Sequence, residues 1–385
     1  MTDLPTQNGP LSGIKVVELA GIGPGPYAGQ LLADMGADVI VIDRPGGALV
    51  PKAIDARGKK SMVLDLKKPE AVAALLKIVE TADVLIEGLR PGVTERMGVG
   101  PDVCHAMNPR LIYGRMTGWG QTGPWSHMAG HDINYIGMTG VLNAIGKDGQ
   151  PPVPPLNMIG DFGGGSMFLV NGILAAIIER AQTGRGNIVD AAIVDGTHSL
   201  MSFVHGMAGV GQWRTKREAN LLDGAAPFYR CYMTADGKFM AVGCIEPQFF
   251  AAMMERLPID REAYGAQHDH AAFAKQHEML EDVFATKTRD EWEAVFAGTD
   301  ACVTPVLDYV EAASHPVNAE RHAVVTDGRW LHPQVAPRLV TQPLPTHFDI
   351  ATKGADYAAI LAEAGLGTDE ISQLIAAGAV VANKD

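Results

Sequence analysis

The chain has 385 residues, of which 47% are apolar and 19% are charged. A chain of this length and apolar content can bury a large core and form more than one lobe, so a single small module is excluded. The formal net charge is −13, and the acidic residues are scattered rather than grouped in a block. This charge disfavours nucleic acid or an anionic membrane as the main partner. A phosphate-bearing ligand must therefore be met by local Lys and Arg side chains.

The cysteines indicate a reducing compartment. Cys104, Cys231, Cys244 and Cys302 are far apart and form no C-x-x-C pair, which favours neither a metal site nor a disulfide framework. The N-terminal MTDLPTQNGPLSG has no basic and apolar leader, and Gly or charged residues interrupt the longest apolar stretches short of a membrane-spanning length. We expect a cytoplasmic protein without a membrane partner.

The first part of the chain alternates β-rich runs with helical periods. Strands are predicted at 14–20, 37–43, 83–88 and 111–118, and helices at 26–36 and 69–82. Such alternation predicts βαβ units and a mainly parallel, Rossmann-like sheet, whose ligand sits at the carboxyl ends of the strands. We expect a large α/β domain over 1–200 that the C-terminal segment 330–385 completes.

Residues 118–165 are rich in Gly, Pro, Asn and His, and an irregular stretch of this length is typical of a functional segment. It leads into 161–180, which opens with Asp161 and three glycines before a long apolar helix. The first-turn N–H groups of such a helix are free to meet an anion or an oxyanion.

The character of the sequence changes near residue 221. Residues 228–245 alternate like two strands around an Asp236-Gly237 turn, and helical segments follow. We expect a linker helix over 201–224 and a smaller α+β domain over 225–329. A helical pair is predicted at 356–365 and 368–378.

The segment 21–26, GIGPGP, resembles a dinucleotide-binding loop after a strand, with Asp43 ending a later strand. However, Pro26 stands where the third glycine of G-x-G-x-x-G belongs, and Pro24 removes an N–H from the loop. We therefore interpret the segment as a tight turn before a helix that starts near a proline.

Two residues in glycine-rich loops can act as acid and base. His131 precedes an apolar helical segment, and Asp161 precedes the Gly-Gly-Gly run. Each has an ordinary structural explanation, because a loop histidine is usually not catalytic and Asp161 suits a helix N-cap. Together they provide one base for each face of a carbon next to a carbonyl. Glu246, at a helix start, could fix the tautomer of a histidine, or simply interact with the helix dipole.

Several cations lie near predicted strand ends of the first domain, where a sheet presents its ligand. Each is most simply a solvated surface charge, and their shared position is what favours phosphate binding. They are Arg44, Arg57, Lys59, Lys60, Arg90 and Arg96.

These residues lie in strings that resemble the α-methylacyl-CoA racemases of the family III CoA-transferase superfamily. The similarity runs through LSGIKVVELAGIGPGPYAGQLLADMGADVI, RPGVTERMGVGP, AGHDINYIGMTGVL, PPLNMIGDFGGGSMFLVNGILAA, VGCIEPQFF and DACVTPVLD, which together extend over nearly the whole chain.

The resemblance implies roles for named residues. His131 and Asp161 would be the two acid/base residues, with Glu246 supporting His131. Asp132 would pair with Asp161, Asn157 would share their hydrogen-bonded shell, and the N–H of Asp161 would hold the thioester oxygen. The residues implied to contact coenzyme A are Ile22, Arg44, Lys59, Lys60, Gly88, Leu89 and Arg96, although Lys59-Lys60 replaces the paired arginines common in the family.

The resemblance also implies an interlocked homodimer and a reaction without a metal or a separate cofactor, since coenzyme A is part of the acyl-CoA substrate. The expected reaction interconverts (R)- and (S)-2-methylacyl-CoA through an enolate. An alternative is a family III CoA-transferase, in which Asp161 attacks the thioester and forms a mixed anhydride. A more distant alternative is a non-catalytic CoA-thioester binding protein.

Overall fold

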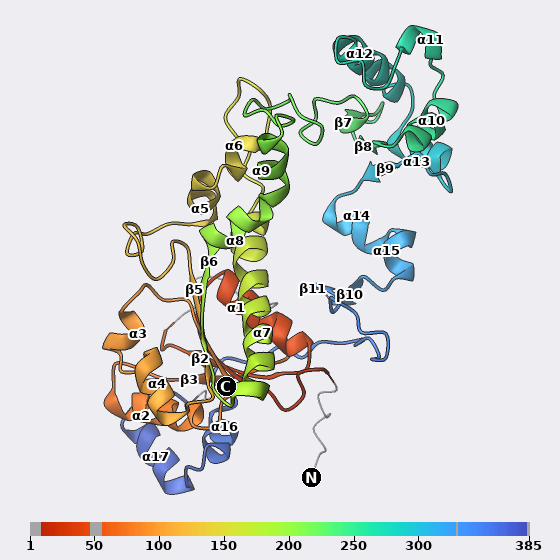
Figure 1. Cartoon of the computed structure of the whole chain (residues 1–385). Coiled ribbons are helices and arrows are strands. Elements are labelled where there is room, and N and C mark those ends of the chain that lie inside the picture. Colours follow the sequence, from red (N-terminus) through yellow and green to blue (C-terminus); the bar gives the residue numbers. More distant parts are fainter. Residues whose placement is uncertain (1–8, 47–55, 329, 383–385) are drawn as a thin grey trace. The chain divides into compact units, whose positions relative to one another are not determined.

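The computed structural model describes residues 9–46, 56–328 and 330–382. It divides into two compact units (Figure 1). The large unit consists of Met1–Thr139, Leu156–Leu200 and His322–Asp385, and the small unit consists of Gly140–Pro155 and Met201–Arg321. Residues 1–8, which form most of the N-terminal segment behind the expected location, lie outside the described residues.

The two units divide the chain differently from the predicted domains. Residues 140–155 group with the small unit, and the chain returns to the large unit at His322 rather than at residue 330. The predicted linker helix over 201–224 is wrong in extent, because helix α9 covers Ser202–Gly209 and the residues after it form turns and irregular structure. Glycines at 209 and 211, the latter at a φ of 75°, accompany the end of this helix.

A sheet of six parallel strands forms the centre of the large unit, in the order β3-β2-β1-β4-β5-β6. This confirms the predicted parallel, Rossmann-like sheet. The order reverses between β1 and β4, and a crevice at the carboxyl ends of the strands is expected at such a point. The strands are β1 (Lys15–Leu19), β2 (Asp38–Asp43), β3 (Lys59–Val63), β4 (Val84–Glu87), β5 (Ile112–Thr117) and β6 (Ile188–Ala192).

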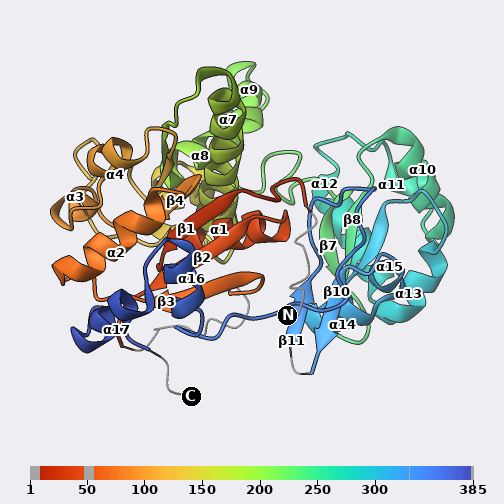
Figure 2. The ribbon, with the colours of Figure 1, turned by 90° about the horizontal axis from the view of Figure 1, so that it is seen from below.

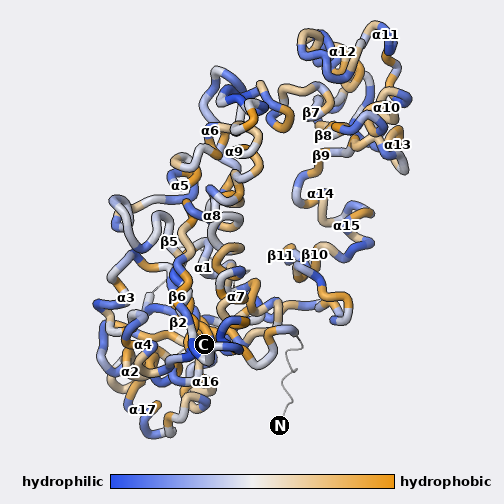
Figure 3. Tube along the Cα trace, viewed as in Figure 1, coloured by the Kyte–Doolittle hydropathy of each residue, from blue (hydrophilic) through white to orange (hydrophobic). Residues whose placement is uncertain are grey.

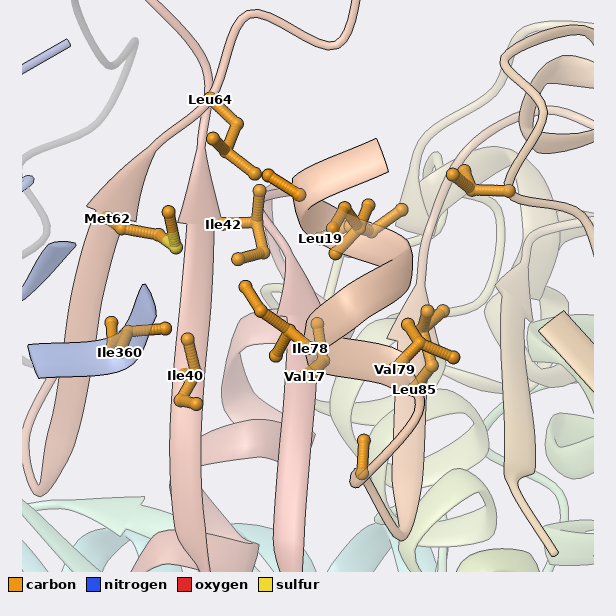
Figure 4. Close-up of a cluster of buried hydrophobic side chains, with 14 of the residues drawn as sticks. Val17, Leu19, Ile40, Ile42, Met62, Leu64, Ile78, Val79, Leu85 and Ile360 are labelled. Carbon is orange, nitrogen blue, oxygen red and sulfur yellow. The ribbon is translucent and has the colours of Figure 1, made fainter. Parts of the chain in front are cut away.

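Helices cover both faces of this sheet, because neighbouring strand residues point to opposite sides and apolar residues occur on both sides. Val17 and Ile40 face a core formed with α2 and α16, to which Ile360 contributes (Figure 4). Val16 and Val39 face a second core formed with α1 and α7. Figure 2 shows α16 beside β3, which it contacts.

Helices α1, α2, α16 and α17 of the large unit follow the predicted periods with small shifts at their ends, whereas α3 and α4 were not predicted. The helices of this unit are α1 (Pro24–Asp34), α2 (Pro69–Val79), α3 (Val93–Arg96), α4 (Pro101–Met107), α5 (Asp132–Met138), the π-helix η1 (Met158–Ser166), α7 (Met167–Thr183), α8 (Ile193–Leu200), α16 (Tyr357–Glu363) and α17 (Thr368–Ala376). A β-hairpin of β10 (Val324–Asp327) and β11 (Trp330–Pro333) opens the C-terminal part of this unit.

Arg57 fastens the C-terminal segment to the large unit. Its guanidinium pairs with Asp34 at 2.5 Å and lies 4.1 Å from the ring centre of Phe348. Its side chain is 2% exposed, so Arg57 is a structural cation and the interpretation of Arg57 as a phosphate contact is wrong.

The small unit has an antiparallel sheet of β7 (Tyr229–Met233), β8 (Phe239–Gly243) and β9 (Val303–Val306). The Asp236-Gly237 turn joins β7 and β8 as predicted, with Gly237 at a φ of 74°. The core of this unit contains Phe228, Tyr232 and Trp292. Its helices are α6 (Val141–Ala144), α9 (Ser202–Gly209), α10 (Pro247–Arg256), α11 (Arg261–Tyr264), α12 (Phe273–Phe284), α13 (Arg289–Phe296), α14 (Tyr309–Ser314) and α15 (Pro316–Glu320).

One helical stretch of the described chain, Met158–Thr183, has the length and apolar composition of a membrane span. The sequence-based expectation that apolar stretches end well short of this length is therefore wrong. Helix α7 is hydrophobic along much of its length (Figure 3). Leu169, Val170 and Ile173 from it are buried against the sheet, a packing that also accounts for an apolar helix.

Candidate active site

A pocket of about 350 Å³ opens in the large unit at the carboxyl ends of β1, β4 and β5. Its walls come from the turn after β1, the loop after β4, the end of β5, the loop before α5, and η1. The predicted site residues that line it are Ile22, Gly88, Leu89, His131 and Asp161. The pocket therefore combines both predicted acid/base residues with part of the predicted coenzyme A path.

Asp161 lies in the π-helix η1, where the Phe162 N–H donates to the Asn157 carbonyl oxygen at 3.3 Å. The glycine run allows this segment to pack closely against α8. A Cβ on Gly164 would lie 2.4 Å from Thr197 Oγ1, and one on Gly196 would lie 1.9 Å from the Gly164 carbonyl oxygen. The glycines after Asp161 are thus needed for close helix packing, and π-helical turns are frequent at functional sites.

Asp132 caps the start of η1. The Asp161 N–H donates to Asp132 Oδ1 at 2.7 Å, and the Gly160 N–H also hydrogen-bonds to the Asp132 carboxylate. The implied pairing of Asp132 with Asp161 is therefore present. The implied role of the Asp161 N–H as the thioester-oxygen donor is not, because this structure commits that N–H to Asp132.

The pKa of the Asp161 carboxyl is raised to about 6. Burial is the largest cause, and the charge of Asp132 acts in the same direction. A side-chain hydrogen bond with Asn157 and the proximity of His131 oppose the shift. Burial also raises the pKa of Asp132. Asn157 thus shares the hydrogen-bonded shell as the resemblance implied, and Asp161 is poised to exchange a proton near neutral pH.

His131 is the residue before α5, and it is exposed at the pocket. Its N–H donates to Asn134 Oδ1 at 3.0 Å, which fixes the entry into the helix. Tyr135, one turn further, donates its hydroxyl to the Gly130 carbonyl oxygen at 2.5 Å. The Tyr135 ring packs directly against Gly130. A Cβ at this position would lie 2.6 Å from the ring, so a side chain here would clash with it.

The GIGPGP turn approaches Asp161. Gly23 adopts a φ of 75°, and a Cβ there would lie 3.1 Å from Asp161 Oδ2. Pro24 begins α1 directly afterwards. The interpretation of the segment as a tight turn before a helix is confirmed, and its glycine also provides close approach to the Asp161 carboxylate.

Of the predicted coenzyme A contacts, Arg44 is exposed directly after β2, and Arg96 is exposed at the end of α3. Lys59 is not placed for such a contact. Its ammonium lies 2.7 Å from Glu18 Oε2 and donates to the Pro26 carbonyl oxygen at 2.8 Å. Its side chain is 1% exposed, so the buried pair with Glu18 uses its charge inside the fold.

Lys60 pairs with Asp38 at 2.9 Å. It stands at the start of β3 and Asp38 at the start of β2, the opposite ends of these strands from the pocket. The assumption that Lys59 and Lys60 follow a strand is therefore wrong, because they begin one.

Glu246 belongs to the small unit, where it is exposed and directly precedes Pro247 at the start of α10. Gln267 holds this turn, since its amide donates to the carbonyl oxygens of Cys244 and Ile245 at 3.0 and 2.8 Å. Its support of His131 stays a prediction. Among the described residues, no group of three or more His, Cys, Asp or Glu side chains could hold a metal ion.

Sequence reasoning missed the parts played by Gly23 and Tyr135, and it named Arg90 only as one surface cation among several. Arg90 and Tyr135 line the pocket. The position of Tyr135 one helical turn after His131 was a usable signal. The approach of Gly23 to Asp161 had none, since 138 residues separate them in the chain.

The sequence matches the model of CoA-transferase family III over residues 11–352. It is 45% identical to the alpha-methylacyl-CoA racemase of Mus musculus over 366 residues, which cover 94% of this chain and 96% of that protein. It is 42% identical to the alpha-methylacyl-CoA racemase of Homo sapiens over 376 residues, 97% and 98% of the two chains.

A solved structure of a CAIB/BAIF family protein from Brucella suis superposes with a TM-score of 0.81 at 27% sequence identity, covering 93% of this chain and all of that one. The agreement extends over the mixed α/β fold with its six-stranded parallel sheet. The chain belongs to CoA-transferase family III.

Proposed function

We propose that the protein is a racemase that interconverts (R)- and (S)-2-methylacyl-CoA by moving the proton next to the thioester carbonyl. The observation that carries the proposal is that His131 and Asp161 line one pocket. Racemisation through an enolate needs an acid and a base on opposite sides of the reacting carbon. Two racemases with nearly full-length similarity support the same reaction.

In this mechanism one of the two residues removes the α-proton and the other returns a proton to the opposite face. A carboxyl group with a pKa of about 6, as for Asp161, can be either acid or base near neutral pH. The roles exchange when the opposite enantiomer binds. No metal or separate cofactor is needed for this proton exchange, because the thioester itself acidifies the α-proton.

The enolate oxygen needs a hydrogen-bond donor that Asp132 has not already occupied. Helix α5 begins at Asp132, directly after His131. Its Asn134 N–H donates to the His131 carbonyl oxygen at 2.8 Å, whereas the first N–H groups of a helix lack intrahelical partners. We assign the oxyanion contact to the N–H groups of Asp132 and Ile133. One well-placed donor of this kind lowers an activation barrier by roughly 3 kcal/mol.

The coenzyme A part of the substrate is assigned to the loops after β2 and β4, with Arg44, Arg90 and Arg96 as phosphate partners. All three are exposed, and Gly88, Leu89 and Arg90 line the same pocket as Asp161. Ile22 and Met128, which are 57% and 51% exposed, offer apolar surface at the pocket. We assign them to the acyl chain and pantetheine.

We further propose a cytoplasmic, interlocked homodimer in which Glu246 supports His131. The resemblance in sequence is what suggests this assembly. Light scattering at catalytic concentrations should give twice the mass of the 40.8 kDa chain. A monomer with full activity would contradict the assembly.

The proposed reaction can be tested with purified protein and a single enantiomer of a 2-methylacyl-CoA, followed by chiral analysis of the hydrolysed acid. Approach to an equal mixture without any acceptor is expected. A parallel incubation with an added carboxylic acid tests the transferase alternative. Transfer of coenzyme A to that acid without loss of chirality would replace the proposal with a transferase that uses Asp161 as the nucleophile.

A further inference from the structure

Glu87 is a buried carboxyl group that directly precedes the pocket-lining loop from Gly88 to Pro91. It is the last residue of β4, an interior strand of the sheet, and it is 0% exposed. A carboxylate without solvent is costly unless it is paired and hydrogen-bonded. Glu87 Oε2 accepts from the Leu89 N–H at 2.7 Å, and Oε1 accepts from Arg115 Nε at 2.9 Å. One carboxylate therefore joins the loop after β4 to β5.

Arg115 extends this connection to α3. Its Nη1 donates to Glu95 Oε1 at 2.8 Å, and its side chain is 9% exposed. Glu95 directly precedes Arg96, and the loop from Gly88 to Pro91 lines the pocket. The two carboxylates and one guanidinium thus fix the segment 88–96 at its beginning and near its end.

The cations of this segment remain free for a ligand. In the part of the chain that the structure describes, Arg90 and Arg96 form no ion pair, and both are exposed. Arg115, in contrast, is buried and uses its charge on Glu87 and Glu95. Arg90 and Arg96 are therefore exposed for a ligand, while Arg115 fixes the segment through Glu87 and Glu95.

We infer that Glu87 and Arg115 are positioning residues, which set the 88–96 segment so that Arg90 and Arg96 meet the phosphates of a coenzyme A thioester. The inference rests on the proposed function, because the ligand is the substrate of the same pocket. Neither residue touches substrate in this account. They act through Leu89 and Glu95, and they affect the binding of the phosphate-bearing end rather than the proton transfer at His131 and Asp161.

The replacement Glu87→Gln tests this role with almost no change in shape. A glutamine has one acceptor oxygen and one donor amide group. If the glutamine oxygen still accepts the Leu89 N–H, its NH2 group faces the Arg115 Nε–H, and two donors cannot hydrogen-bond to each other. The variant therefore loses either the hydrogen bond to Leu89 or the one to Arg115.

We expect the KM for a 2-methylacyl-CoA to rise about tenfold in Glu87→Gln, with kcat within about twofold of the parent, because a hydrogen bond to a charged group is lost. The same acyl group on pantetheine, which lacks the nucleotide phosphates, should show an unchanged KM. Glu80→Gln is the matched control, since Glu80 forms an exposed pair with Lys77 on α2. It should leave the KM for both thioesters unchanged.

A merely structural role would lower kcat equally for both substrates and leave both KM values unchanged, and this result would overturn the inference. If Glu87→Gln does not fold, Glu95→Gln replaces it, because Glu95 is 45% exposed. It should raise the KM for the CoA thioester about threefold and spare the pantetheine thioester. An unchanged ratio of the two KM values would overturn the inference.

The inference and the proposed function fail in different ways. If the parent protein does not racemise, calorimetric titration with coenzyme A itself gives a Kd for the parent and for each variant. A weaker Kd in Glu87→Gln would then support the positioning role without the racemase reaction. An unchanged Kd would overturn it.

Discussion

The main-chain N–H of Asp161 donates to Oδ1 of Asp132 at 2.7 Å, so the Asp132 carboxylate fixes the backbone of Asp161. The same proximity places two negative charges near each other, and the charge of Asp132 contributes to the raised pKa of Asp161. Asp132 therefore both positions Asp161 and adjusts its acidity. These two effects can be separated, because an asparagine keeps an acceptor oxygen but removes the charge.

In Asp132→Asn, the acid limb of the pH dependence of kcat/KM should move to lower pH for the enantiomer whose α-proton Asp161 removes. The parent limb is expected near pH 6, where the Asp161 carboxyl titrates. Removing a neighbouring negative charge makes ionisation of Asp161 easier and lowers its pKa. Rate profiles between pH 4.5 and 8 (roughly two units around this pKa) would measure the shift. A limb that stays in place would mean that Asp132 has no electrostatic effect on Asp161.

Replacing Asp161 with Asn should stabilise the protein at pH 8 while abolishing racemisation. The folded pKa of Asp161, about 6, exceeds the ordinary aspartate value of 3.8, so ionisation opposes folding. This penalty develops as the pH rises from about 4 to about 6, and it is absent below both pKa values. Discounted for solvent screening, the gain in free energy of unfolding is roughly 1 kcal/mol.

Urea unfolding of Asp161→Asn and the parent at pH 8 and pH 4 measures this difference. The curves should separate at pH 8 and coincide at pH 4. A variant that is less stable than the parent at pH 8 would show that the carboxylate contributes favourable contacts to the fold.

Gly160→Ala should displace Asp132, because a Cβ at this position would lie 2.3 Å from Asp132 Oδ1. We expect kcat/KM to fall by about tenfold or more, since a small misplacement of a reacting group is costly. Gly206→Ala is the control, because a Cβ on Gly206 meets no atom within 4 Å. Steady-state kinetics give kcat/KM for both variants. Equal values would contradict the prediction that a Cβ at position 160 displaces Asp132.

Lys59→Met should destabilise the fold by about 3–5 kcal/mol, because it removes the cation of a buried ion pair with Glu18. Lys60→Met should cost about 0–1 kcal/mol, since its pair with Asp38 is substantially exposed. Urea unfolding of the two variants gives the comparison. If the main effect of Lys59→Met were instead a raised KM with normal stability, Lys59 would be a phosphate contact after all.

The fold was largely predictable because the sheet strands are short apolar runs separated by helical periods. Consecutive apolar residues such as Val16 and Val17, whose side chains point to opposite faces, indicate a strand that is buried on both faces. The boundary between the two units was less accessible. Residues 140–155 join the small unit through contacts with distant residues, including Arg217 with the Gln150 carbonyl oxygen at 2.5 Å, and local composition carries no trace of such contacts.

The glycine-rich loops and the resemblance singled out His131 and Asp161, which line one pocket; their acid/base roles stay a prediction. The errors concerned cations that were assigned to phosphate binding. The sequence does not show whether a basic side chain faces solvent or a buried acid. Arg57 and Lys59 pair with Asp34 and Glu18, which lie 23 and 41 residues earlier in the chain. Partners this distant follow from the tertiary fold alone.

The most direct test of the account is proton NMR of a single enantiomer of 2-methylacyl-CoA with the protein in D₂O, without an acceptor acid. We expect the α-proton signal to disappear as deuterium enters with inversion, and we expect inversion to be lost in His131→Ala and in Asp161→Ala. Retention of the α-proton by active, folded parent protein, with coenzyme A passing to a carboxylic acid added afterwards, would contradict the two-base mechanism.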